Sequence, residues 1–230
     1  MSNEIELPES VGMSSQRLSR IGNAMQRYID DGTVRGISTM VMRKGKVVHA
    51  EQFGHRDAEA GLEITPDTIF RIYSMTKPIV STALMLLHEA SAFQLEDPVA
   101  KYLPAFAATQ VLGANGKLEP QARPMEIRDL LTHTSGLTYD FMEDTPVGHL
   151  YRDARIMNDA TRSLEEVIDA LAKIPLANQP GSRWHYSVGI DVAARLIEVL
   201  SGRSLGAFLA ERVFGPLGMT DTGFGVANSN

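Results

Sequence analysis

The sequence of 230 residues contains no cysteine, and this absence narrows the chemistry that the protein can perform. Disulfide bonds, thiolate nucleophiles and iron–sulfur or zinc sites built on cysteine are excluded. The six histidines form neither an H-x-x-x-H nor an H-E-x-x-H pattern. We therefore predict no metal site and no cofactor.

Runs of one kind of residue are also missing. Lysine and arginine together number 22 against 28 acidic residues, and they form no basic run, which argues against nucleic acid as a main partner. No apolar run is long enough to span a bilayer, and the acidic first residues lack the apolar segment of a signal peptide. We expect a cytoplasmic protein without a membrane partner, although a mature exported form would have the same sequence.

The order of the remaining patterns predicts an α+β fold. Apolar residues recur at helical spacing over residues 18–29. Two β-rich runs, residues 36–43 and 47–54, flank a glycine-containing turn and so predict a hairpin. Residues 94–180 are rich in proline and indicate mainly helix and loop. An antiparallel sheet flanked by helices, joined to a mostly helical region, fits this order.

The most informative short pattern is Ser-x-x-Lys at Ser74 and Lys77. Residues at i and i+3 share a helix face, so the hydroxyl and the amine lie within reach of each other. A serine becomes a nucleophile when a base takes its proton, and lysine can do so if its surroundings lower its pKa. Pro78 is tolerated in a first helical turn, which places Ser74 at the start of a helix that runs to about Ala92.

A second serine also lies in a pattern that is typical of hydrolases. Residues 202–206 read Gly-Arg-Ser-Leu-Gly and match the G-x-S-x-G elbow, which needs a strand before the serine and a helix after it. The preceding residues 191–200 have helical periodicity instead. We therefore interpret Gly202 as the end of one helix and Ser204 as the N-cap of the next.

Tyr186 lies on a loop before the helix at residues 189–200. A tyrosine can shuttle protons if cationic neighbours lower its pKa, although a tyrosine taken alone is more often a packing residue.

Four segments, in order, resemble the penicillin-recognising serine hydrolases, which include class C β-lactamases, DD-peptidases and family VIII carboxylesterases. They are the nucleophile segment at residues 72–78, Leu-Leu-Thr-His-Thr-Ser-Gly-Leu at residues 130–137, the stretch at residues 180–187, and a Phe-x-Pro-Leu-Gly-Met segment at residues 214–222. The resemblance covers nearly the whole chain and implies a β-lactamase/transpeptidase-like fold.

The resemblance implies three catalytic roles. Ser74 would form the acyl-enzyme, Lys77 would activate it, and Tyr186 would pass protons to the leaving group and from the deacylating water. The backbone N–H of Ser74 would be one oxyanion donor. Which of Lys77 and Tyr186 takes the serine proton stays open, as it does for related enzymes.

Two departures from the family pattern shape the prediction. Penicillin-converting members usually carry asparagine two residues after the catalytic tyrosine, where this chain has Val188. Since valine cannot supply that hydrogen bond, we favour a carboxylesterase for small to medium acyl esters. The alternatives are a β-lactamase or D-amino-acid peptidase and a non-catalytic penicillin-binding-like module.

The second departure is the end of the chain at Asn230. Family members continue with further strands, one of which supplies a second oxyanion donor. We therefore expect those C-terminal strands to be absent from this chain. The expected partners are an ester substrate and a second chain that supplies the missing strands. We predict three parts. Residues 1–92 form the N-terminal part of an α/β domain and contain the nucleophile helix, residues 93–200 form a mostly helical domain, and residues 201–230 form a return segment toward the α/β domain.

Overall fold

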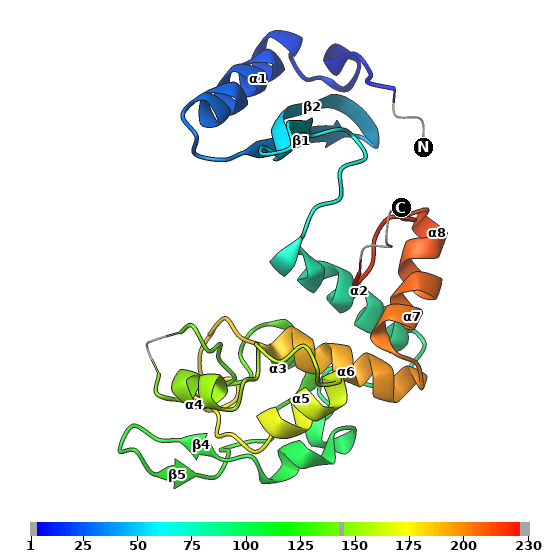
Figure 1. Ribbon diagram of the computed structural model, residues 1–230. Helices are drawn as coiled ribbons and strands as arrows, with labels where there is room; N and C mark the ends of the chain where they lie inside the picture. The colour runs from blue at the N-terminus through cyan, green and yellow to red at the C-terminus, as the bar shows by residue number, and fades with distance from the viewer. Residues whose placement is uncertain (1–3, 143–144, 226–230) are drawn as a thin grey trace. The chain divides into compact units, whose positions relative to one another are not determined.

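The structure is a computed structural model that describes residues 4–142 and 145–225. Contacts within the chain divide it into two units, Met1–Arg71 and Ile72–Asn230, each of which can be followed by its colours in Figure 1. The nucleophile helix lies in the second unit. The three-part division at residues 92 and 200 stays a prediction.

The first unit is an antiparallel sheet with a helix packed on it, as the hairpin pattern predicts. Its strands follow the order β1-β2-β3, and β1 pairs with β2 from Gly36 opposite Gly54 to Arg43 opposite Lys46. The two turn residues, Lys44 and Gly45, have left-handed φ values of 51° and 73°, as a tight hairpin turn requires. The elements are a 3₁₀ turn (Pro8–Val11), α1 (Ser15–Asp30), β1 (Gly36–Arg43), β2 (Lys46–Asp57) and β3 (Leu62–Glu63).

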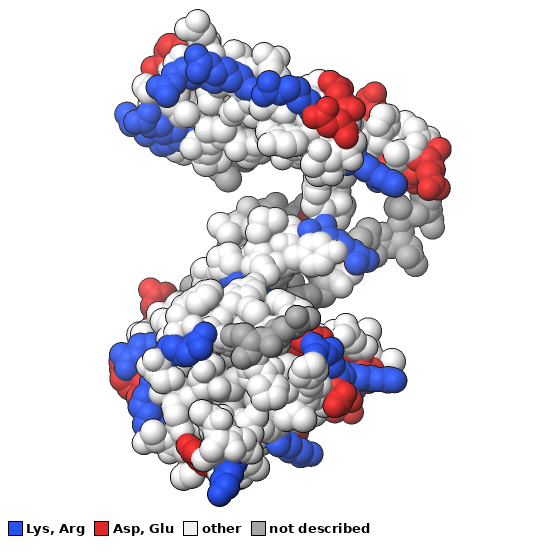
Figure 2. Space-filling view, turned by 90° about the vertical axis from the view of Figure 1, so that its left-hand side faces the viewer, with Lys and Arg blue, Asp and Glu red and all other residues white. Residues whose placement is uncertain are grey.

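Charged side chains are distributed differently over the two units. Figure 2 shows basic side chains along one side of the first unit, whereas acidic and basic side chains are interspersed over the second. Arg17, Arg20 and Arg27 are exposed arginines of α1 in the first unit. None of the described helices is long and apolar enough to cross a membrane.

The second unit is mostly helical and is organised around one buried helix, α6. Val192, Ala193, Leu196 and Ile197 of α6 have no exposed surface, and α2, α3, α5 and α7 all pack against this helix. The helices are α2 (Thr76–Glu89), α3 (Ile127–Leu131), α4 (Val147–Asp153), α5 (Leu164–Leu171), α6 (Gly189–Ser201), α7 (Leu205–Leu209) and α8 (Gly215–Leu217), with a π-helical turn at Ala210–Phe214. 3₁₀ turns lie at Tyr73–Met75, Val99–Lys101 and Pro104–Ala108. A two-stranded sheet, which the sequence analysis missed, is formed by the short strands β4 (Val111–Leu112) and β5 (Leu118–Glu119).

The helix ends around the second serine are those that the sequence predicts. Gly202 terminates α6 in the left-handed conformation, with φ at 67°. The Ser204 hydroxyl oxygen accepts a hydrogen bond from the Ala207 N–H at 3.3 Å and caps α7. A helix rather than a strand precedes Ser204, so the elbow interpretation is excluded. No strand follows α6 within residues 202–225.

Candidate active site

Ser74 lies in the 3₁₀ turn that leads directly into α2, two residues before the helix begins. Tyr73 has a φ of 43°, a left-handed conformation that is unfavourable for a tyrosine and prevents the helix from starting earlier. Pro78 is the third residue of α2, within the turn that tolerates it. At the other end, the left-handed Ser91 stops the helix at Glu89, so the predicted end near Ala92 is too late.

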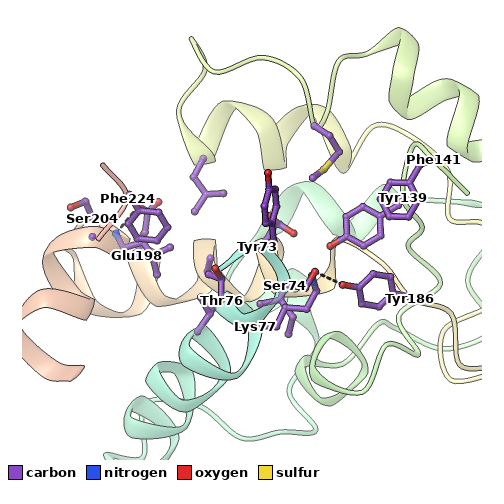
Figure 3. A pocket seen from close by; sticks show the side chains of 18 residues that line it. Tyr73, Ser74, Thr76, Lys77, Tyr139, Phe141, Tyr186, Glu198, Ser204 and Phe224 are labelled. Carbon is purple, nitrogen blue, oxygen red and sulfur yellow. Dashed lines mark hydrogen bonds between the residues drawn. The ribbon is translucent and has the colours of Figure 1, made fainter. Parts of the chain in front are cut away.

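The structure brings the three predicted side chains together, as Figure 3 shows. The Ser74 hydroxyl oxygen lies 2.7 Å from the Tyr186 hydroxyl, although the two residues are 112 positions apart in the sequence. Lys77 donates a hydrogen bond from Nζ to the same Ser74 oxygen at 3.3 Å. The backbone N–H of Ser74 lies in the same 3₁₀ turn, and its role as an oxyanion donor stays a prediction.

Tyr186 is held in place through its two neighbours in the chain. The His185 N–H donates to the His133 carbonyl at 2.7 Å, and the His185 ring nitrogen Nε2 lies 2.8 Å from the Thr138 hydroxyl. On the other side, the Ser187 N–H donates to Nδ1 of His133 at 3.3 Å. The segment around residues 130–138 thus supports the loop that carries Tyr186.

Tyr139 is a site residue that the sequence analysis missed. The Lys77 Nζ lies 4.7 Å from the ring centre of Tyr186 and 5.4 Å from that of Tyr139, so the ammonium faces two aromatic rings. Phe141 stacks on Tyr139 with a ring separation of 4.8 Å. A tyrosine in an irregular segment has no periodicity or motif of its own, and no signal in the sequence could have identified it.

The ionisation of the site follows from these contacts. Burial acts to lower the pKa of Lys77, but hydrogen bonding with the Tyr139 and Tyr186 hydroxyls outweighs it and leaves the pKa raised. The same hydrogen bond from Lys77, followed by that from Ser74, lowers the pKa of Tyr186. Lys77 is therefore an ammonium near neutral pH. The lowered lysine pKa that a lysine base requires is not found.

His133 and Tyr139 remain uncharged beside this ammonium. Burial and, after it, the positive charge of Lys77 lower the pKa of His133. Burial raises the pKa of Tyr139. Among Lys77, His133, Tyr139 and Tyr186, Lys77 alone carries a positive charge near neutral pH. Tyr186 is the one of the two tyrosines whose pKa is lowered.

Ser74 opens into a pocket of about 610 Å³, whose lining is largely apolar. Figure 3 shows Tyr139, Phe141 and Tyr186 on one side of Ser74, and Glu198, Ser204 and Phe224 on the other. Val188 does not line this pocket, since its buried side chain faces a smaller cavity beside it. Among the described residues no cluster of three or more histidine or acidic side chains could hold a metal ion.

The chain is similar to known proteins in both sequence and structure. The Beta-lactamase family model matches residues 21–230. Protein Rv1367c of Mycobacterium tuberculosis is 36% identical over 89% of this chain, and Esterase EstB of Burkholderia gladioli is 34% identical over 90%; the match spans 51% of each of these relatives. The solved structure of EstCE1, described as a hydrolase with promiscuous acyltransferase activity, superposes with a TM-score of 0.82 at 32% identity, over 92% of this chain and 54% of the other.

The chain spans about half the length of the curated relatives that it matches. Within that half lie the turn that carries Ser74, the loop that carries Tyr186 and the helices that hold them. With a family model that matches from α1 to the last residue and a structural match at this level, the chain belongs to the Beta-lactamase family and has its β-lactamase/transpeptidase-like fold.

Proposed function

We propose that this protein is a serine hydrolase that cleaves carboxylic esters through an acyl-enzyme on Ser74. One observation carries the proposal: the Ser74 hydroxyl oxygen lies between the Lys77 ammonium at 3.3 Å and the Tyr186 hydroxyl at 2.7 Å. A nucleophile within hydrogen-bonding distance of a base that is itself oriented by a third group is the arrangement that covalent catalysis requires.

We assign the role of base to Tyr186. In its ionised form, Tyr186 takes the proton of Ser74 while the serine oxygen attacks the ester carbonyl. The oxyanion that develops accepts a hydrogen bond from the Ser74 N–H. The alcohol leaves with the proton from Tyr186, which restores the phenolate. In deacylation the phenolate takes a proton from water, and the resulting hydroxide attacks the acyl group. The bond between the acyl group and the Ser74 oxygen then breaks, and Tyr186 returns the proton to Ser74. Lys77 stays charged throughout and stabilises the phenolate.

Esters fit the pocket better than β-lactams. Val188 stands where a penicillin-converting enzyme would offer an amide, and its buried side chain supplies no hydrogen bond to a lactam side chain. The apolar lining near Ser74 suits an acyl chain of small to medium length. The names of the relatives Esterase EstB and EstCE1 support the same reaction class.

Acyl transfer to an alcohol is a second candidate. The related hydrolase EstCE1 is described as having promiscuous acyltransferase activity. In such a reaction an alcohol replaces water as the acceptor, and Tyr186 takes its proton in the same way. A pocket that is largely apolar favours an organic alcohol over water as the bound acceptor.

The proposal is tested with two serine variants that share one pocket. Ser74→Ala should abolish fluorophosphonate labelling and the turnover of p-nitrophenyl esters. Ser204→Ala is the matched control, because Ser204 also lines the pocket but its oxygen caps α7. Loss of activity in Ser204→Ala with retention in Ser74→Ala would overturn the assignment.

The two remaining alternatives are separated in the same experiment. Faster turnover of nitrocefin than of esters would favour a β-lactamase. A folded protein that is not labelled at Ser74 would favour a non-catalytic module.

A further inference from the structure

Asp191 places a carboxyl group in the reaction pocket for which the mechanism has no use. It is the third residue of α6 and lines the pocket of about 610 Å³ that contains Ser74. It also lines a second cavity of about 290 Å³, and the two cavities share Met157, Leu164 and Asp191. The carboxyl group therefore lies where the reaction pocket meets a side pocket.

The Asp191 carboxyl has no partner side chain within the described residues. The carboxyl group accepts a hydrogen bond from the backbone N–H of Asp191 itself. The positive charge of Lys77 attracts it without a direct contact, and both effects act to lower its pKa. The other carboxyl group in the pocket, that of Glu198, accepts from the Leu205 N–H at 2.9 Å and pairs with Arg195 at 3.2 Å. Asp191 is half-buried and lines both cavities, so its carboxyl group is accessible to a donor that a ligand brings.

A neutral donor fits this position better than a cation. Burial raises the pKa of Asp191, because it makes the ionised form less favourable. Lys77 already supplies a positive charge in the same pocket, and a second cation would be repelled by it. A hydroxyl group is the neutral donor that a carboxyl group accepts in either protonation state.

The side pocket indicates what accompanies that hydroxyl. Beyond the three shared residues, it is lined by Arg162 and by apolar side chains, namely those of Ile156, Val167, Ile168, Leu171 and Val188. Arg162 pairs with Asp159 and donates a hydrogen bond to the Ala154 carbonyl, although its buried Nε makes no hydrogen bond within the described residues. The apolar side chains of the lining accept an alkyl tail.

We propose that Asp191 is a specificity residue that binds a hydroxyl group on the acyl chain of the substrate, while the alkyl tail beyond it enters the side pocket. The preferred substrates are then hydroxyacyl esters. This inference rests on the proposed function, because it names the acyl group that Ser74 would receive.

The test compares methyl hexanoate with its 2-hydroxy and 3-hydroxy derivatives, which differ from it by one hydroxyl group. The protein should cleave at least one hydroxy ester at least tenfold more efficiently, measured as kcat/KM, than methyl hexanoate. Asp191→Leu should remove this preference by slowing the hydroxy ester alone, and Asp191→Asn should keep part of it, since an amide oxygen still accepts a hydrogen bond.

Glu166→Gln is the matched control for a merely structural role. Glu166 is also the third residue of a helix, α5, but it bonds to Ser163 in a capping box and lines neither cavity. A loss of thermal stability in both variants, with a loss of preference in Asp191→Leu alone, supports the proposal. An unchanged preference in Asp191→Leu overturns it, and if that variant does not fold, the Asp191→Asn ratio decides.

Binding separates this inference from the proposed function. The Ser74→Ala variant should bind the hydroxy ester at least tenfold more tightly than methyl hexanoate, and the added Asp191→Leu change should remove the difference. If the protein cleaves no ester but this binding ratio holds, the proposed function fails and the hydroxyl site stands. Equal binding of all three esters overturns the inference even where turnover is found.

Discussion

Replacement of Lys77 by methionine tests which group is the base. The change keeps an unbranched side chain that is one atom shorter and removes its charge. If Tyr186 is the base, its pKa sets the acidic limb of the rate profile, because only the ionised tyrosine accepts the serine proton. Lys77 lowers that pKa through its hydrogen bond. We therefore expect the midpoint of the limb to move to higher pH in Lys77→Met, with a lower rate at pH 7.

The distance in the structure sets the size of this shift. A unit charge at the 4.7 Å that separates Lys77 Nζ from the Tyr186 ring centre interacts by about 0.9 kcal/mol in bulk water and by about 3.5 kcal/mol at an effective dielectric constant of about 20. At about 1.36 kcal/mol per tenfold in rate, labelling at pH 7 should slow by about 4-fold to 400-fold. The lower part of this range is expected if water penetrates the pocket.

The assay is the rate of fluorophosphonate labelling of Ser74 against pH, followed by intact mass. This readout is insensitive to spontaneous ester hydrolysis. Lys101→Met is the matched control, since Lys101 lies 5.0 Å from the ring centre of Tyr102 in a similar pair away from Ser74. Its profile should not move.

Two outcomes would refute the reasoning. If Lys77 were the titrating base, the limb would disappear in Lys77→Met instead of moving. If His133 caused the limb, its pKa would also rise on loss of Lys77, because the lysine charge helps to lower it. Tyr186→Phe separates these cases, since it should remove the limb if Tyr186 is the base and retain it if His133 is.

Three further predictions follow from particular contacts. Tyr139→Phe removes a hydroxyl that helps to lower the pKa of the proposed base, so the acidic limb should move to higher pH by less than in Lys77→Met. Gly136→Ala should lower the unfolding free energy by about 1 to 3 kcal/mol in urea titrations, because Gly136 has a φ of 83° and an added Cβ meets a facing backbone carbonyl. The Gln94 N–H and then the Tyr102 hydroxyl lower the pKa of Asp97 from 3.8 to about 2. Asp97→Asn should therefore cost about 1 kcal/mol at pH 7 after solvent screening, with the difference lost as the pH falls from about 4 to about 2.

Features of the fold that depend on near neighbours could be predicted from the sequence. The β1–β2 hairpin, the capping box of Ser163 and Glu166, and the stop at Gly202 all arise from residues within a few positions of each other. The start of α2 at Thr76 rather than Ser74 could not be predicted. Ser74 and Met75 instead belong to the 3₁₀ turn at Tyr73–Met75, which begins with the left-handed Tyr73, a conformation that a tyrosine does not signal.

The candidate site was accessible to sequence reasoning only in part. The proximity of Ser74 and Lys77 follows from their spacing, whereas Tyr186 joined them through the family resemblance. Tyr139 and Asp191 carry no motif, and they enter the pocket because α6 and the segment before α4 pack beside the nucleophile turn. Contacts between distant segments decide such positions, and a single sequence does not display them.

The spacing of Ser74 and Lys77 fixes their distance but not their protonation. The hydroxyl groups that surround the ammonium belong to Tyr139 and Tyr186, which are at least 62 positions further along the chain. Each hydrogen bond between the ammonium and a tyrosine raises the lysine pKa and lowers that of the tyrosine, because both ionised forms gain from the same contact. The two candidate bases are therefore not independent. The contact that makes Lys77 a poor base is the one that makes Tyr186 a better one, so a variant that weakens it and keeps both side chains must move the two pKa values in opposite directions.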